Sequence, residues 1–265
     1  MDAAIMTVDP LHLLGAFGAA FLAGAINSVA GGGTLISFPV LVALGLPPVI
    51  ANATNTVGIW PGTIGSIWGF RRELERVNRR LFWLLIPAVI GGVAGACLLR
   101  RTPPEVFAAL VPWLILFATV LFILQAPVQR MLRSVEAAKH AGAGWLAAAL
   151  VAQAGIAIYG GFFGAGMSIM ALSVLGMIGM TDILEMNAMT SLLSCATNGV
   201  AGIIFGVTGL VAWPYVAAMV LGALVGGYGA AGVARRIGKK NVRAFVILVG
   251  ITIAAVLFRR LAVAH

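Results

Sequence analysis

The chain carries few charges for its length. Of its 265 residues only 9% are charged and 61% are hydrophobic, whereas soluble domains carry about 25% charged residues. This balance excludes a soluble domain. The 17 lysines and arginines give a net charge of +9, but they lie in short clusters between apolar runs, as in membrane loops, and do not form a nucleic-acid surface. The sequence predicts a multi-pass membrane protein surrounded by lipid, with no nucleic-acid partner.

Residues that bind metals or perform catalysis are also scarce. Cys97 and Cys195 each lie alone in an apolar run and are interpreted as small hydrophobic residues, and the three histidines lack ligand spacing. No ionisable side chain lies in the middle of an apolar run, and the hydroxyls of 190–195 have no histidine or lysine beside them. An enzyme needs an acid–base pair, an activated nucleophile or a metal cluster. We therefore expect no catalysis, no cofactor and no metal.

What the chain does contain is a repeat, about 135 residues apart. The paired motifs are Asn52-Ala53 with Asn187-Ala188, Gly91-Gly92 with Gly226-Gly227, and Arg100-Arg101 with Arg235-Arg236. The cluster Gly31-Gly32-Gly33 matches Gly164-Ala165-Gly166 at a spacing of 133. A duplicated hydrophobic unit with a glycine-rich break at the same place in each copy is typical of secondary transporters.

The lengths of the apolar runs predict the helices. Six runs approach the ~20 residues that a bilayer requires: 51–70, 81–99, 105–125, 186–207, 210–234 and 242–258. Two longer stretches, 11–46 and 143–181, are interrupted by glycines near their middle. Each of these two is expected to form a broken, re-entrant pair of half-helices.

The positions of the basic residues favour this topology. With the N-terminus outside, the re-entrant pairs place 13 of the 17 basic residues inside, whereas single crossings place at best 10 there. Three spans in each copy is an odd number, so the copies are expected to be inverted. The predicted fold is an all-α integral membrane protein with repeat 1 at 11–125, repeat 2 at 143–258 and a basic cytoplasmic linker at 126–142.

Uncharged polar residues gather around the two glycine breaks and form the candidate substrate site. In the first copy they are Asn27, Ser28, Gly31, Gly32, Gly33, Thr34, Asn52, Thr54 and Asn55, and in the second Gly164, Gly166, Ser168, Asn187, Thr190 and Ser191. Freed backbone N–H groups and half-helix N-termini suit a small anion that must also be released. The alternative that an Asn or Thr at a helix start only caps the helix stays open for each of them.

Two segments resemble the TauE/SafE family of sulfite exporters. They are AGAINSVAGGGTLISFPVLVALGLPPVIANATNTV and GGFFGAGMSIMALSVLGMIGMTDILEMNAMTSL, and the resemblance covers about residues 13–258. It implies a transporter of the bacterial cytoplasmic membrane for sulfite, sulfonate or other small organosulfur anions. The resemblance implies that positions matching the family motif belong to the substrate site, and these include Gly161 in addition to the residues above. Because the second copy has Ala165 in place of a glycine and lacks the Asn-Ser pair, the two halves are expected to contribute unequally.

Several alternatives remain open from the sequence. Asp182 and Glu185 either stabilise the start of the next helix or act as proton-coupling carboxylates at the mouth of the site. The expected function is export of a sulfur-containing anion by alternating access. A channel-like permease for another small solute is the second possibility, and a membrane scaffold, disfavoured by the short loops, is the third. Small-residue faces such as Gly58, Gly62, Gly65 and Gly69 predict close helix packing and are compatible with a homodimer.

Overall fold

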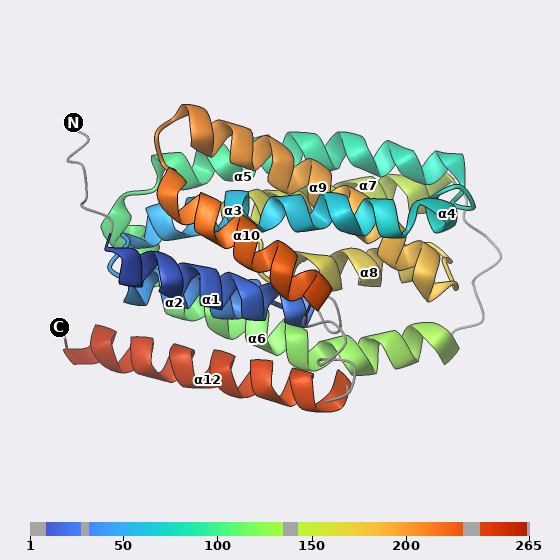
Figure 1. Cartoon of the computed structure of the whole chain (residues 1–265). Helices are drawn as coiled ribbons and strands as arrows, with labels where there is room; N and C mark the ends of the chain where they lie inside the picture. The colour runs from blue at the N-terminus through green and yellow to red at the C-terminus, as the bar shows by residue number, and fades with distance from the viewer. Residues whose placement is uncertain (1–8, 28–31, 135–142, 230–238, 264–265) are drawn as a thin grey trace.

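The structure is a computed structural model that describes residues 9–27, 32–134, 143–229 and 239–263, and within these ranges it contains helices and no strand (Figure 1). The helices are α1 (Pro10–Asn27), α2 (Thr34–Ala43), α3 (Pro48–Gly69), α4 (Arg71–Leu74), η1 (Arg79–Leu84), α5 (Leu85–Arg101), α6 (Pro104–Ser134), α7 (Ala143–Phe162), α8 (Met167–Met177), α9 (Ile183–Val207), α10 (Trp213–Gly229) and α12 (Lys239–Val263).

Five helices among the described residues are long and apolar enough to cross a membrane: Pro10–Asn27, Arg79–Arg101, Pro104–Gln125, Ile183–Val207 and Asn241–Arg259. Large apolar side chains such as Leu11, Val151 and Val207 are exposed on the outside of this bundle. A bilayer is the solvent that accommodates such a surface. The all-α integral membrane class predicted from the sequence is therefore confirmed.

The expected span at 51–70 is a helix, α3, but α3 is not one of the five. It has 22 residues, enough to span, yet it opens with Asn52, Thr54, Asn55 and Thr56, all of which are buried. These polar residues lower its hydropathy. Because they are buried against other helices, α3 is a central helix whose polar face is turned away from the lipid.

The first glycine-interrupted stretch forms a helical hairpin. A Cβ placed on Gly33 would lie 2.5 Å from the carbonyl oxygen of Ala23, and one on Gly15 would lie 3.2 Å from Leu44. Contacts between 23 and 33 at one end and between 15 and 44 at the other mean that α1 and α2 run antiparallel. At 1.5 Å per residue the 18 residues of α1 are about 27 Å long, close to a hydrocarbon core of about 30 Å, whereas α2 has only 10 residues.

The second interrupted stretch is built in the same way. Its first helix, α7, ends at Phe162 and its second, α8, begins at Met167, whose side chain contacts Gly160. The second helix of each stretch ends at a glycine with positive φ, Gly45 at 91° and Gly179 at 94°. In both, the N–H of the next residue donates to a carbonyl five residues back, which is a Schellman C-cap.

Two seams of glycine hold the halves together. The glycines of α10 meet the backbone of α1, with Gly226 against the carbonyl of Phe21 and Gly222 against that of Phe17. The glycines of α5 meet α7 in the same way, since a Cβ on Gly91 would lie 2.7 Å from the carbonyl oxygen of Ala154. Only glycine allows two helix backbones to approach so closely. Each seam joins the first helix of one copy to a helix of the other copy.

Helices at the same place in the two copies pack against each other and run antiparallel. The indole of Trp60 in α3 donates to the carbonyl of Cys195 in α9 at 3.1 Å, and Val57 packs against Gly202. Likewise α6 packs on α12, where Trp113 meets Phe258 and Thr119 meets Gly250. In both pairs the residue number rises along one helix as it falls along the other.

The structure differs from the sequence-based expectations in further places. The expected span at 210–234 is described as α10 over Trp213–Gly229, which is not one of the five. Helix α6 continues to Ser134, so the first part of the expected linker 126–142 is helical, and 135–142 lies outside the described residues. The expected packing face of α3 is also shorter than predicted. Gly58 meets Met219, but a Cβ on Gly62, Gly65 or Gly69 would meet nothing within 4 Å, because this part of α3 is exposed.

The seams can be tested with matched glycine variants. We expect Gly91→Ala to lower the thermal unfolding midpoint of the detergent-purified protein by several degrees, because overpacking at a close contact costs about 1–3 kcal/mol. Gly65→Ala, in a helix of the same kind but with open space beside it, is the control and should leave the midpoint unchanged or raise it. Equal midpoints for the two variants would contradict the assignment of Gly91 to a backbone seam.

Candidate substrate site at two helix breaks

At the first break, a side chain and a glycine close the gap between α1 and α2. The Asn27 Oδ1 accepts a hydrogen bond of 2.8 Å from the Gly33 N–H. Gly32 has a φ of 87°, and a Cβ there would lie 2.7 Å from the Phe122 ring of α6. Thr34 begins α2. Asn27 therefore caps α2 across the break, and the predicted site residues Ser28 and Gly31 lie outside the described residues.

At the second break, two glycines with positive φ turn the chain, Gly164 at 82° and Gly166 at 81°. The Tyr159 hydroxyl donates to the carbonyl of Ala165 at 2.7 Å, so a side chain again satisfies the non-helical backbone. A Cβ on Gly166 would lie 3.2 Å from Leu121 of α6. Helix α6 therefore contacts both breaks, through Phe122 at the first and Leu121 at the second.

Two residues predicted for the second half of the site lie differently. Gly161 packs against the carbonyl of Gly92 in α5, so its lack of a side chain serves the α5–α7 seam. Ser168, in the first turn of α8, is exposed. The two breaks also differ in their backbone, since Gly33 is in the right-handed helical region whereas Gly166, at the matching position, is left-handed.

The start of α3 connects the two breaks. The Asn52 Nδ2 donates to the carbonyl of Phe162, the last residue of α7, at 2.9 Å. One turn further, the Asn55 Oδ1 accepts a hydrogen bond of 2.6 Å from Ser37 of α2. Both asparagines are 1% exposed, and the Asn52 Oδ1 has no partner. An amide group with an unused acceptor thus lies buried between the two halves.

Ser37 is a site residue that the sequence analysis missed. It is fully buried and also donates weakly to the carbonyl of Gly33 at 3.2 Å. A signal was present in the sequence, since Ser37 lies one helical turn after Gly33 in an otherwise apolar segment.

The other predicted polar residues fall into two groups. Thr54 accepts a hydrogen bond of 3.0 Å from the Ala212 N–H just before α10, and Ser191 donates to the carbonyl of Asn187 in its own helix. Thr190, in contrast, is 5% exposed and its hydroxyl has no partner. Thr54 and Ser191 are thus engaged with the backbone, whereas Thr190 is not.

The two acidic residues lie at the start of α9. The Asp182 Oδ1 accepts hydrogen bonds from the N–H groups of Leu184 at 2.7 Å and Glu185 at 3.4 Å, so Asp182 is the N-cap. Asp182 is exposed and Glu185 is half-buried in the first turn. Negative charge at this position stabilises the helix dipole.

A half-buried arginine, which the sequence analysis did not single out, supports the first break. Arg243 of α12 donates through Nη2 to the carbonyl oxygens of Phe122 at 2.6 Å and Ile123 at 2.8 Å. Pro127 has no N–H, so the carbonyl of Ile123 lacks its usual helical donor. The guanidinium carbon of Arg243 also lies 5.8 Å from the centre of the Phe122 ring that contacts Gly32.

This support is open to a direct test. We expect Arg243→Met to lower the thermal unfolding midpoint by several degrees, because a hydrogen bond from a charged group contributes about 1.5–3 kcal/mol. Arg243→Lys, which keeps a donor, should lose less. The control is Arg259→Met, on an exposed residue of the same helix. If Arg243→Met unfolds at the wild-type midpoint, the arginine does not support α6.

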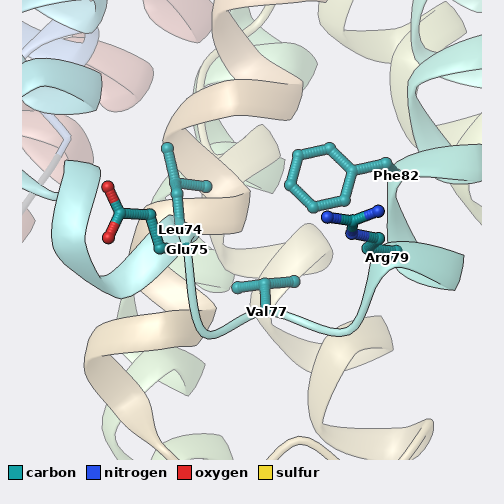
Figure 2. Close-up of a pocket in the computed structure, with 5 residues that line it drawn as sticks. All are labelled: Leu74, Glu75, Val77, Arg79 and Phe82. Carbon is teal, nitrogen blue, oxygen red and sulfur yellow. The ribbon is translucent and has the colours of Figure 1, made fainter.

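The described residues also form a surface pocket, which no residue of either break lines. It has a volume of about 390 Å³ and lies at the turn between α4 and η1, lined by Leu74, Glu75, Val77, Arg79 and Phe82. Figure 2 shows Val77 at the base of the turn, with Leu74 and Glu75 on one side and Arg79 and Phe82 on the other. None of these residues belongs to the predicted site.

The chemistry available at the breaks is that of neutral hydrogen-bonding groups. Amides, hydroxyls and glycine backbone from both halves converge there, close to the N-termini of α2 and α8. In the described ranges no group of three or more His, Cys, Asp or Glu residues could hold a metal ion. Interrupted helices at membrane depth are tolerated where they line a polar site inside the protein. The fold and the site define a membrane transporter with broken helices.

Comparison with known proteins identifies the family. A family model described as Sulfite exporter TauE/SafE matches residues 16–257. The chain therefore belongs to the TauE/SafE sulfite exporter family, as the resemblance in its sequence predicted. This is a family of membrane transporters and not a known class of enzymes.

Curated relatives carry matching names. The "Probable membrane transporter protein YfcA" of Escherichia coli K12 is 28% identical over 253 residues, which cover 95% of this chain and 91% of the relative. A "Probable membrane transporter protein" of Haemophilus influenzae is 28% identical, covering 94% of each chain. The "Probable membrane transporter protein ORF9" of Sinorhizobium sp is 29% identical over 245 residues, 92% of this chain and 91% of the relative. No solved structure gives a significant match. The chain is a multi-pass protein of the bacterial inner membrane.

Proposed function

We propose that this protein is a secondary transporter that exports a small sulfur-containing oxyanion, such as sulfite or a sulfonate, by alternating access around the two helix breaks. The family description supports the sulfur chemistry. The observation that carries the proposal is Asn52, whose buried amide nitrogen donates to the carbonyl of Phe162 at the second break and has a second N–H for an oxyanion. Because Asn52 lies where the two halves meet, a solute that binds there would change the contact between them.

Neutral donors suit the release of such an anion. Hydrogen bonds from amides, hydroxyls and helix N-termini stabilise an oxyanion, but without the strong attraction of a buried ion pair. We propose that Asn27, Gly32, Gly33, Thr34, Asn52 and Asn55 form the first half of the site, and Gly164, Gly166, Asn187 and Thr190 the second. Gly161 packs against α5, and Thr54 accepts a hydrogen bond from the residue before α10. We therefore assign these two residues a supporting role.

Alternating access requires two halves that exchange roles, and we propose that the halves are inverted repeats. Trp60 and Cys195 are separated by 135 residues, the repeat interval, and they contact each other. Residues related by a two-fold axis meet their own equivalents only on the axis. Since α3 and α9 are antiparallel, this axis would lie across the helices and hence in the membrane plane. The matching seams at Gly91 and Gly226 support the same relation.

The inverted topology has a direct test with equivalent positions. Glu75 and Leu210 occupy the same place in the two repeats, 135 residues apart, so single cysteines there should be labelled from opposite sides of the membrane. In a background with Cys97 and Cys195 replaced by alanine, we expect Glu75→Cys to react with an impermeant maleimide only after the cytoplasmic side is exposed, since 71–80 carries five arginines. Leu210→Cys should react in intact cells. Labelling of both from one side would contradict inversion.

The membrane potential is sufficient to drive export. An inside-negative potential of 100 mV favours exit of one negative charge by about 2.3 kcal/mol. Asp182 is engaged as the N-cap of α9 and Glu185 lies in the same first turn. We therefore propose that potential drives the anion, and that any coupling proton would be carried by Glu185 rather than by Asp182.

The function can be tested in proteoliposomes containing the purified protein. We expect saturable flux of sulfite or a sulfonate under an imposed potential without a pH gradient. Asn52→Leu, which keeps the volume but removes the amide, should reduce this flux at least about tenfold, because a hydrogen bond to a charged solute is lost. Asn52→Asp, which adds a negative charge, should abolish it.

The control is Asn78→Ser. Asn78 caps η1 by accepting from the Arg80 N–H at 3.0 Å, and serine is an equally good cap. Flux that rises linearly without saturation would instead indicate a channel-like permease. No flux of any sulfur oxyanion by the folded wild-type protein would overturn the proposed substrate.

A further inference from the structure

Helix α9 carries a further group of buried polar side chains, which begins at Thr190 of the proposed site. Thr190 and Ser194 are 5% and 6% exposed, and their hydroxyls have no hydrogen-bond partner. On α7, Gln153 is 1% exposed and its Nε2 has no partner either. Neither Gln153 nor Ser194 belongs to the site described above. Together with the Asn52 Oδ1, they are the buried side-chain atoms without a partner among the described residues.

The two hydroxyls lack a hydrogen bond although each has a helical carbonyl oxygen, four residues earlier, as a usual acceptor. A Ser or Thr in an apolar helix commonly donates to the carbonyl four residues earlier. Ser173, Thr119 and Ser191 all do so here, at 2.7–2.9 Å. Thr190 and Ser194 lie in the same helix as Ser191 and do not. Their hydroxyls therefore do not form the bond that their own helix offers.

Helix geometry brings Gln153 to the same place. A Cβ on Gly160 of α7 would lie 3.1 Å from the Thr197 methyl of α9. Both helices also pack on α5, where Gly91 and Gly95 meet Ala154 and Ile158 of α7 while Ala88 and Gly92 meet Thr197 and Val200 of α9. The residue numbers rise together in both pairs, so α7 and α9 run parallel. Gln153 lies seven residues before Gly160, and Thr190 seven before Thr197. Seven residues are about two turns, so Gln153 and Thr190 remain on the facing stripes at the same height.

This polar group is continuous with the second break. Ser194 lies one turn after Thr190, and Asn198 one turn after Ser194. The Asn198 Oδ1 would lie 3.8 Å from a Cβ on Gly164. Residues 190, 194 and 198 therefore form a polar track along α9 that ends at the break.

Packing does not require polar residues at these places. By the repeat spacings of 133 and 135, the positions of Gln153 and Ser194 in the first half are occupied by Ala20 and Ile59. The first half thus has apolar side chains at two of the three matching places, with Ala20 fully buried, and at the third Asn55 is paired with Ser37. A buried polar group without a partner costs about 1–3 kcal/mol. The second half bears this cost three times in one interface.

We propose that Gln153, Thr190 and Ser194 form an access subsite for the transported oxyanion on the cytoplasmic side of the second break. This inference rests on the proposed function. The amide and the two hydroxyls supply neutral donors that replace part of the hydration shell of the anion before it reaches Gly164 and Gly166. A small oxyanion with several acceptor oxygens fits this set, whereas a solute without acceptors would leave the donors unpaired.

The test compares apolar variants of near-equal volume, with sulfite as the probe. We expect Gln153→Met, Thr190→Val and Ser194→Ala each to raise the KM of sulfite flux about tenfold. The stabilisation of the purified protein by sulfite should shrink in parallel. The unfolding midpoint without sulfite should stay equal or rise, because each change removes an unpaired buried group. Thr190→Ser, which keeps the hydroxyl, should restore the wild-type KM even if Thr190→Val folds poorly.

Thr119→Val and Ser173→Ala are the matched controls, since their hydroxyls bond to their own helices. Both should keep the wild-type KM. If the subsite variants gain stability but keep the wild-type KM and the sulfite-induced shift, the cluster holds only buried water and the subsite is overturned. If the wild-type protein moves no sulfur oxyanion, the proposed function fails. Failure of the subsite alone differs from this, because wild-type flux of sulfite then persists.

Discussion

Every backbone N–H and C=O group that lies within a membrane must find a partner inside the protein, because lipid offers none. This protein interrupts its helices twice and contains Pro127 within α6, and each interruption frees such groups. At both breaks and at Pro127, specific side chains satisfy some of these groups. Asn27 satisfies Gly33, Tyr159 satisfies Ala165, Asn52 satisfies Phe162, and Arg243 satisfies Ile123. The polar residues at the breaks are thus first of all structural, and they become available for a solute only where an atom remains unused.

That condition separates the candidate site residues more sharply than their position in the sequence. Thr54, Thr56 and Ser191 have hydrogen bonds to backbone groups in the described state. The Asn52 Oδ1 and the Thr190 hydroxyl do not. An oxyanion that accepts from the Thr190 hydroxyl gains a hydrogen bond without breaking one in the protein. An oxyanion that accepts from the Gly33 N–H must displace the Asn27 Oδ1. The first kind of residue therefore contributes more to affinity, and the second couples binding to movement of α2.

The sequence predicted the helical class, the positions of both breaks and the family, because apolar length and glycine clusters are local features. It did not predict the contacts that complete the site. Ser37 is an isolated polar residue, and its role depends on Asn55, which lies 18 residues away. Arg243 lies at the start of the expected run 242–258, and only the packing of α12 on α6 shows that it reaches Ile123. The prediction of a closely packed glycine face on α3 was wrong beyond Gly58. Periodicity indicates which residues share a face but not whether another helix covers that face.

The two halves show how one fold position can serve different purposes. At the start of α3 the asparagine Asn55 is paired with Ser37, whereas at the matching place in α9 Thr190 has no partner. Ser37 itself corresponds to Met170, which cannot donate a hydrogen bond. The first half is thus closed by a hydrogen bond where the second leaves a buried hydroxyl free. If the halves exchange conformations during transport, they do so with unequal chemistry, and the solute meets different donors on its two sides.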